Sequence, residues 1–214
     1  MTEKNTVLTP EVKQMKRSDE RQIPYPQGMG RWLLRLPLEL YRLGLGDVLN
    51  LGQLMILGTR GRKSGQPRYT PIEYRQHGSK LYIVSAWGER PQWFRNLQAN
   101  PEVLVQQGKH QFAARAEVVT NSGETLAVLH LFRRRAPYLY DPLIARMSDR
   151  DKIDERMLPD ISGQITVVRF DPLDTPSDLP ALPADRAWLW PLALALTILA
   201  LVLLIAGKRS RRPR

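Results

Sequence analysis

A glycine-rich stretch between residues 58 and 68 carries four cationic side chains and could hold an anion. Its cations and glycines are Arg60, Arg62, Lys63 and Arg68 with Gly58, Gly61 and Gly65. Glycine leaves backbone N–H groups open to a ligand, and arginine adds two parallel donors that match a phosphate. The runs on either side, 53–57 and 68–74, have the composition of strands. The pattern predicts the tip of a hairpin that binds an anion, with an ordinary solvated turn as the alternative.

The order Gly61-Arg62-Lys63-Ser64 comes close to the phosphate-binding loop of nucleotide hydrolases but departs from it. That motif places Gly-Lys-Ser/Thr five residues after its first glycine and continues directly into a helix. Here Pro67 and a strand-like run follow instead. We therefore exclude nucleotide hydrolysis.

A short helix is the second segment with chemical potential. Pro91 suits its first turn, and Asn100-Pro101 stops it. Trp93 and Asn96 are three residues apart and share a face, which places an indole beside an amide. A core tryptophan with an incidental surface amide is the alternative interpretation.

Composition limits the chemistry that the chain can perform. Its 214 residues, 43% of them hydrophobic, suffice for one domain with a proper core and an appendage. Cysteine is absent, which excludes disulfides, thiolate nucleophiles and cysteine-ligated metals. His77, His110 and His130 lie far apart without metal-ligand spacing, so no metal site is predicted.

The net charge of +11 indicates an acidic partner, although much of it is local. Five basic residues fall within the last eight positions, and without them 27 basic residues face 21 acidic ones, an excess of +6. This excess suits an anionic ligand or a membrane surface at least as well as nucleic acid.

The remaining periodicities describe strands that follow one another closely, with a few helices. A helix is predicted from Pro37 to Gly44, and another from a cap at Asn121 or Ser122 to Phe132. Further strands are predicted at 80–85, 102–106, 111–118 and 163–170. The interval 137–159 has only a weak pattern and is interpreted as variable covering structure. Short turns between successive strands indicate an antiparallel meander or barrel.

The two ends of the chain differ from its centre. Residues 1–29 are polar and without periodicity, which predicts disorder, and they contain no apolar export signal. After the domain at 30–170, four prolines make 171–186 a predicted tether. Residues 187–207 contain no charged residue and are predicted to cross a membrane, followed by a basic tail at 208–214. The expected location is the cell membrane, with a single-pass C-terminal anchor and the domain in the cytoplasm.

Taken in order, several motifs resemble the deazaflavin-dependent nitroreductase and quinone reductase family. They are Gly61-Arg62-Lys63-Ser64-Gly65, Arg68, Thr70-Pro71, Trp93-Phe94-Arg95-Asn96-Leu97 and Ala99-Asn100-Pro101. The resemblance covers about residues 43–119. It implies an α+β, mainly antiparallel β fold, a split β-barrel of the FMN-binding type with flanking helices, to which the C-terminal transmembrane helix is added.

The resemblance also implies the cofactor and the residues that hold it. The cofactor would be coenzyme F420, a deazaflavin whose tail carries a phosphate and glutamates. Arg62, Lys63 and Arg68 fall on family positions that meet the anionic tail, while Pro71, Trp93 and Asn96 fall near the cofactor's body. The loop between Ser85 and Pro91 departs from the quinone-reductase pattern, which leaves its phosphate contacts open.

Hydride transfer belongs to the cofactor, so the protein needs no nucleophile and no metal of its own. The expected reaction passes a hydride from reduced F420 to a lipophilic acceptor, such as a quinone or a nitro or enone compound, at the membrane. Tyr138 and Tyr140 are candidates for hydrogen bonding the acceptor or donating a proton, with ordinary packing as the alternative.

Two other functions stay open at this point. A split barrel of this kind also accommodates FMN, whose phosphate requires similar contacts. A third interpretation is a non-enzymatic, membrane-attached module in which the basic hairpin and Trp87 or Trp93 bind nucleic acid or anionic lipid. The cations cluster at one turn rather than along a face, so no nucleic-acid partner is expected. The sequence makes no prediction of oligomeric state.

Overall fold

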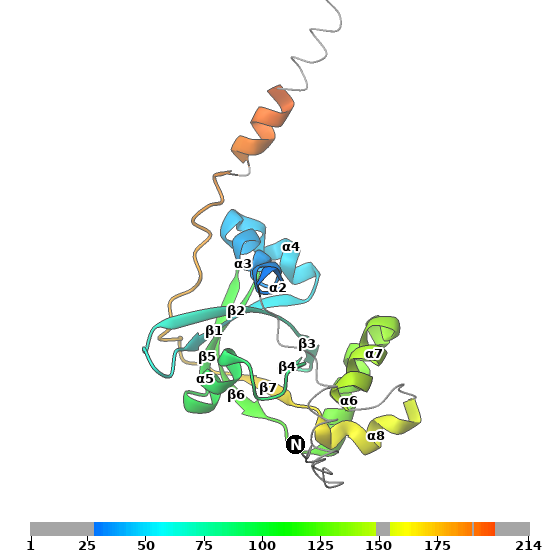
Figure 1. Ribbon diagram of the computed structural model, residues 1–214. Coiled ribbons are helices and arrows are strands. Elements are labelled where there is room, and N and C mark those ends of the chain that lie inside the picture. The colour runs from blue at the N-terminus through cyan, green and yellow to red at the C-terminus, as the bar shows by residue number, and fades with distance from the viewer. Residues whose placement is uncertain (1–27, 149–154, 190, 200–214) are drawn as a thin grey trace, which may run out of the picture.

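Seven antiparallel strands form one sheet in the computed structural model, which describes residues 28–148, 155–189 and 191–199 (Figure 1). They are β1 (Leu54–Arg60), β2 (Pro67–Glu73), β3 (Arg75–His77), β4 (Lys80–Val84), β5 (Glu102–Gln107), β6 (His110–Val118) and β7 (Val167–Pro172). Their order across the sheet is β2-β1-β5-β6-β7-β4-β3. The predicted strands are confirmed, except that the last begins at Val167 rather than at 163, because residues 162–164 form a 3-10 helix. The short β3 is added to them.

The sheet curls on itself because of how β2 continues into β3. These strands lie at opposite edges of the sheet, yet only Tyr74 separates Glu73 at the end of β2 from Arg75 at the start of β3. One residue cannot span a flat sheet of seven strands, each separated from the next by nearly 5 Å. The edges must therefore approach each other, and the curled antiparallel sheet with its helices fits the predicted split β-barrel.

The β1–β2 hairpin is confirmed, and backbone bonds close its tip. Arg60 pairs with Pro67 at the last rung of the ladder. Beyond it, the Gly61 N–H donates to the Gln66 carbonyl at 2.9 Å, and the Gly65 N–H donates to the Gly61 carbonyl at 2.7 Å. Gly65 has φ +68°, a conformation that favours glycine. The glycines thus shape a tight loop from which the cationic side chains project.

Helices surround the sheet. They are α2 (Met29–Leu33), α3 (Leu36–Leu40), the π-helical η1 (Tyr41–Leu45), α4 (Gly46–Leu51), α5 (Gln92–Ala99), α6 (Ser122–Arg135), α7 (Pro137–Met147), η2 (Glu155–Met157), α8 (Leu158–Ile161) and η3 (Ser162–Gln164). The predicted cap at Asn121 is confirmed, since its side chain accepts from the Glu124 N–H at 2.9 Å. In Figure 1, α6, α7 and α8 lie together beside the sheet.

The interval predicted as weakly patterned covering structure contains α7, which was missed. Pro137 at its first turn starts this helix, and Tyr140 and Ile144, four residues apart, are both buried. They join an apolar cluster with Leu129 and Phe132 of α6 and with α8. A second cluster, which includes Phe94 of α5, fills the inside of the curled sheet.

The predicted transmembrane helix over 187–207 is wrong for the part of the chain that the structure describes. Within 28–148, 155–189 and 191–199, no helix has both the length and the apolar character needed to cross a bilayer. Residues 191–199 of this interval are helical. The predicted single-pass anchor, and the membrane location that depended on it, are corrected accordingly.

Parts of several predictions fall outside the described residues. They are the disorder expected at 1–27, residues 149–154 of the expected covering structure, position 190 and residues 200–207 of the expected span, and the basic tail at 208–214.

The proline-rich segment after the last strand lies against the sheet, and we call residues 173–187 the strap. Leu179 is buried, and the Tyr69 hydroxyl donates to the Pro180 carbonyl at 2.5 Å. Gln106 of β5 accepts from the Leu182 N–H at 2.8 Å and donates to the Leu182 carbonyl at 3.4 Å. A proline-rich chain has few donors of its own, so these side chains from the sheet fix its path.

Candidate functional site

The hairpin tip and α5 meet through one asparagine. The Asn96 side-chain oxygen accepts from the Arg62 backbone N–H at 3.3 Å and from Arg62 Nη1 at 3.2 Å. Its amide nitrogen donates to Thr59 Oγ1 at 3.3 Å, and Arg62 Nη1 also donates to Gln92 Oε1 at 3.0 Å. Asn96 is only 5% exposed, so a buried amide with partners on both sides holds the two segments together. The predicted spacing of Trp93 and Asn96 therefore places both beside the loop.

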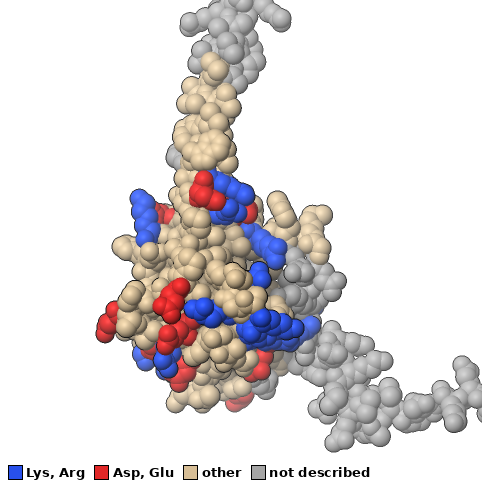
Figure 2. All heavy atoms as spheres, turned by 90° about the vertical axis from the view of Figure 1, so that its left-hand side faces the viewer, with Lys and Arg blue, Asp and Glu red and all other residues tan. Residues whose placement is uncertain are grey.

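A cavity of about 680 Å³ opens beside this junction, and we call it the basic cavity. Its charged lining consists of Arg35, Arg42, Arg62, Lys63 and Arg68 with the single carboxylate Glu39. Trp93, Asn96 and Leu182 also border it. Figure 2 shows the side of the molecule to which the hairpin tip points, and Lys and Arg side chains gather on it. Five cations against one carboxylate suit a ligand with several negative charges.

A second cavity of about 480 Å³, the apolar cavity, adjoins the first. The two share lining residues, namely Arg35, Leu38, Tyr69, Thr70, Gln92 and Trp93. Much of the remaining wall is apolar or aromatic and includes Pro71, Ile72, Leu129, Phe132 and Ile144. A ligand could therefore place an anionic end in the basic cavity and a planar, apolar end here.

A polar group of three residues lies at one wall of the apolar cavity, where Glu73 and Tyr140 line the space and Arg75 is bonded to both. Arg75, 4% exposed, donates to Glu73 Oε1 at 2.6 Å and to the Tyr140 hydroxyl oxygen at 3.0 Å, and its guanidinium lies 4.6 Å from the Phe132 ring centre. The Tyr140 hydroxyl donates to Glu73. Burial, and then the hydrogen bond to Glu73, raise the pKa of Tyr140 to about 12. This phenol therefore keeps its proton at neutral pH.

The predicted site residues divide between the two cavities. Arg62, Lys63, Arg68, Trp93 and Asn96 line the basic cavity, whereas Pro71, Trp93 and Tyr140 line the apolar one. Tyr138 is 83% exposed and borders neither of them. The structure thus brings seven of the eight candidates together, and their roles stay predictions.

Sequence reasoning missed several residues that border the cavities or are bonded to their lining. Arg35 and Arg42 were not singled out, although their spacing of seven places two cations on one side of two turns. Glu73 and Arg75 were passed over because they flank the point where β2 becomes β3, which only the curled sheet reveals. Leu182 lies far along the chain and has no local signal.

The hairpin tip leaves little room for a side chain at Gly61. A Cβ at Gly61 would lie 2.9 Å from Ser64 Oγ and 3.1 Å from the Gln66 carbonyl oxygen, so a larger residue would force the tip apart. The compact loop, the five cations and the adjoining apolar space together fit a phosphorylated cofactor with a planar ring.

Comparison with known proteins matches this site to one family. The model of the F420H(2)-dependent quinone reductase family matches residues 35–148, more than half of the chain. F420H(2)-dependent quinone reductases of two Mycobacterium tuberculosis strains, H37Rv and CDC 1551, are each 37% identical over 68 residues. Each match covers 30% of this chain and 46% of the relative, so the chain spans about half the length of these relatives.

A solved structure of an F420-H2 dependent reductase is 24% identical, with a TM-score of 0.42, and covers 56% of this chain and 94% of that one. The family match contains the hairpin, α5 and the polar group around Tyr140. Coenzyme F420 is implicated as the cofactor by the family's description. The chain belongs to the F420H(2)-dependent quinone reductase family.

Proposed function

We propose that this protein transfers a hydride from reduced coenzyme F420 to a lipophilic acceptor such as a quinone, with nitro and enone compounds as further candidates. The observation that carries the proposal is the junction of the hairpin tip with α5, through Arg62 and Asn96, beside two adjoining cavities of opposite character. A cofactor with an anionic tail and an apolar ring system requires one basic and one apolar cavity side by side. Family membership and the two quinone reductase relatives support the same reaction.

The cations of the hairpin have the first role. Arg62, Lys63 and Arg68 bind the phosphate and carboxylates of the cofactor tail through charge-assisted hydrogen bonds. Asn96 positions Arg62 by accepting from its backbone N–H and from its guanidinium. The loop is therefore held in place before the ligand arrives, which reduces the conformational entropy lost on binding.

Residues that line the apolar cavity have the second role. Trp93 and Pro71 pack against the deazaflavin ring and exclude water from it, and the bound cofactor supplies the hydride. Trp93 is itself supported by an edge-to-face contact with the buried Phe94, at 5.7 Å between ring centres. The acceptor occupies the rest of the apolar cavity.

The lining of the apolar cavity favours Tyr140 over Tyr138 as the hydroxyl that meets the acceptor. With Arg75 and Glu73 beside it, its proton can pass to an oxygen of the reduced acceptor. Arg75, 3.0 Å from the phenol oxygen, partly offsets the Glu73 carboxylate, which disfavours the negative charge left there.

Ligand titration of the purified protein tests the proposal. We expect reduced and oxidised F420 to bind with micromolar or tighter affinity, and a quinone to oxidise the bound reduced cofactor, which restores the deazaflavin absorbance. FMN, titrated in parallel, should bind more weakly. Absence of F420 binding would reject the proposal, and preferential binding of FMN would replace its cofactor.

A further inference from the structure

One cation of the basic cavity already holds a carboxylate of this chain. Arg42 of η1 forms a two-pronged pair with Asp185 of the strap, with Nε 2.9 Å from Oδ1 and Nη2 2.6 Å from Oδ2. Arg42 lines the basic cavity, as does Leu182, three residues before Asp185 on the strap. This is the geometry in which arginine binds a free carboxylate ligand.

Further contacts place this end of the strap at the cavity's edge. The Arg186 N–H donates to the Arg42 carbonyl at 2.8 Å, and the Arg186 side chain pairs with Glu39, the carboxylate that lines the cavity. Glu39 also lies 3.9 Å from Arg42 Nη1. Arg42 and Glu39 of α3–η1 thus pair with Asp185 and Arg186 of the strap. These contacts hold the strap against one wall of the basic cavity.

The pair between Arg42 and Asp185 is exposed enough to exchange partners. The two side chains are 29% and 42% exposed, and ion pairs in contact with water contribute little net stability. Arg42 lowers the pKa of the Asp185 carboxyl, which therefore carries its charge at neutral pH. An incoming carboxylate could replace it without leaving a buried charge unpaired.

The strap is also the part of the cavity wall that the family match does not cover. That match ends at residue 148, whereas the strap comprises residues 173–187. Any effect of Asp185 on the ligand is therefore a property of this chain beyond the matched region.

We propose that Asp185 is a displaceable counter-ion, which occupies Arg42 until a glutamate carboxylate of the F420 tail replaces it. The strap thereby weakens binding of forms of the cofactor whose tail reaches Arg42, and it has no such effect on forms without glutamates. The inference rests on the proposed function. It adds that Asp185 makes the affinity of this protein for F420 depend on the glutamates of the cofactor tail.

The sign of the expected effect separates this role from a structural one. If Asp185 competes with the ligand, Asp185→Asn frees Arg42 and removes a repelling charge, so the tail should bind more tightly. If Asp185 only anchors the strap, the same change should loosen the cavity wall and weaken binding or leave it unaltered. The two roles therefore predict opposite or distinguishable shifts in Kd.

The experiment measures Kd in the full chain for F420 with glutamates and for F420 without them. Asp185→Asn should lower the Kd of the glutamate form about three- to tenfold and leave the other form within about twofold. Asp178→Asn is the matched control, because Asp178 is an exposed carboxylate of the same strap outside the cavity lining. It should shift neither value.

A second variant and a second readout complete the test. Arg42→Gln should weaken binding of the glutamate form, and adding Asp185→Asn to it should then give no gain. In the unaltered protein, the glutamate form should speed hydrogen exchange at the Arg186 amide more than the form without glutamates does.

An unchanged or raised Kd in Asp185→Asn, or equal exchange with both ligands, would overturn the inference. If neither form binds the unaltered protein, it is the proposed function that fails.

Discussion

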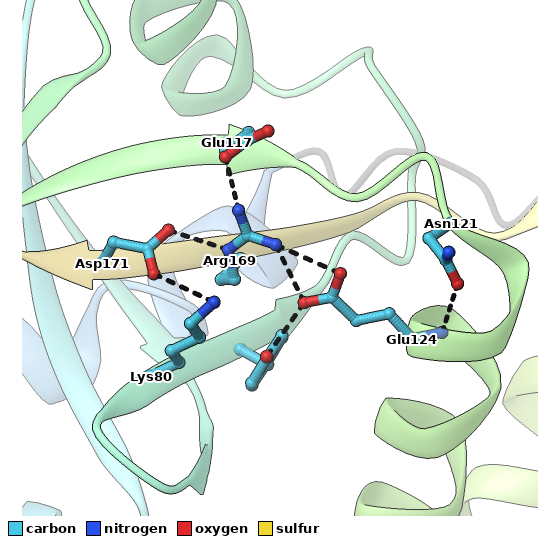
Figure 3. Close-up of polar contacts among 7 residues, drawn as sticks. Lys80, Glu117, Asn121, Glu124, Arg169 and Asp171 are labelled. Atoms are coloured by element: carbon cyan, nitrogen blue, oxygen red, sulfur yellow. Dashed lines mark hydrogen bonds and ion pairs between the residues drawn. The ribbon is translucent and has the colours of Figure 1, made fainter.

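Two groups of charged residues in this protein use arginine in opposite ways. Arg169 of β7 donates to Asp171 at 2.8 Å, to both Glu124 oxygens at 3.0 and 3.1 Å, and to Glu117 at 2.5 Å (Figure 3). Its side chain is 17% exposed, and every arm of its guanidinium meets a carboxylate. The Asp171 and Glu124 hydrogen bonds raise the pKa of Arg169 still further, so its charge is permanent.

The hairpin at the basic cavity shows the contrary arrangement. Within the described part of the chain, Arg62, Lys63 and Arg68 form no ion pair with a carboxylate. Arg62 has amide oxygens as its partners instead, and all three side chains face the cavity. An arginine whose partners lie within the fold serves stability, whereas cations that face a cavity are available to a ligand. The comparison predicts that substitutions in the two groups will affect different quantities.

The largest effect is expected on stability, from Arg169→Met. The change keeps much of the side chain's apolar length but leaves Glu117, Glu124 and Asp171 close together without their shared cation. Removing one partner of a fully buried ion pair costs about 3–5 kcal/mol, and partial solvent exposure reduces this to about 2–4 kcal/mol here. Urea denaturation should show this loss, while the Kd for F420 of the folded protein changes less than about twofold.

Arg115→Met is the matched control for that experiment. Arg115 pairs with Glu102 at 3.1 Å on the same sheet, but the two side chains are 59% and 65% exposed. The loss of stability should stay below about 1 kcal/mol. If Arg169→Met and Arg115→Met lower the free energy of unfolding equally, the ion pairs of Arg169 stabilise the fold no more than an exposed pair does. The proposed difference between the two groups of arginines would then be wrong for stability.

Lys63→Gln addresses the cavity side of the comparison. The side chain is exposed and lines the basic cavity, so losing its charge removes a contact to the cofactor's anionic tail. We expect F420 binding to weaken by about 1–3 kcal/mol, while the free energy of unfolding changes by less than about 0.5 kcal/mol. Isothermal calorimetry and urea denaturation measure the two quantities.

Lys109→Gln removes the same charge at the β5–β6 turn, outside both cavity linings. It should leave the affinity for F420 unaltered. Equal losses in Lys63→Gln and Lys109→Gln would mean that only the overall charge matters, and that the hairpin holds no specific contact.

The same contrast explains what the sequence could predict. The hairpin, α5 and the capped start of α6 follow from local signals, which are glycines, Pro91, Asn100-Pro101 and Asn121. The convergence of the hairpin with α5 followed from the family resemblance, because no local rule places Asn96 against Arg62.

Other features depend on contacts between distant parts of the chain. Arg75 meets Tyr140 only because β3 closes the curled sheet next to α7. The membrane helix was predicted from composition alone, and no helix among the described residues is long and apolar enough to cross a bilayer. Charge and apolarity alone could not reveal that the proline-rich strap lies along the sheet, since its partners, Gln106 and Tyr69, come from other strands.

The smallest expected effect is a pH dependence of stability in the group around Arg169, which the three hairpin cations should not share. Burial raises the pKa of Glu124, but hydrogen bonds from Arg169 and Tyr82 outweigh it and leave that pKa below its usual value. A lowered carboxyl pKa adds stability that is fully present above the unfolded value of about 4.3 and is lost as the pH falls through the lower folded value.

Glu124→Gln removes this titration, since its amide stays neutral at every pH. The variant should therefore be less stable than the unaltered protein by about 1 kcal/mol at neutral pH, and the gap should close below about pH 4. Urea midpoints for both proteins across an acid pH series measure it. A gap that persists below the folded pKa of Glu124 would mean that packing rather than charge explains the residue. Lys63→Gln should show no such convergence in stability, because Lys63 lies outside the ion pairs formed among the described residues.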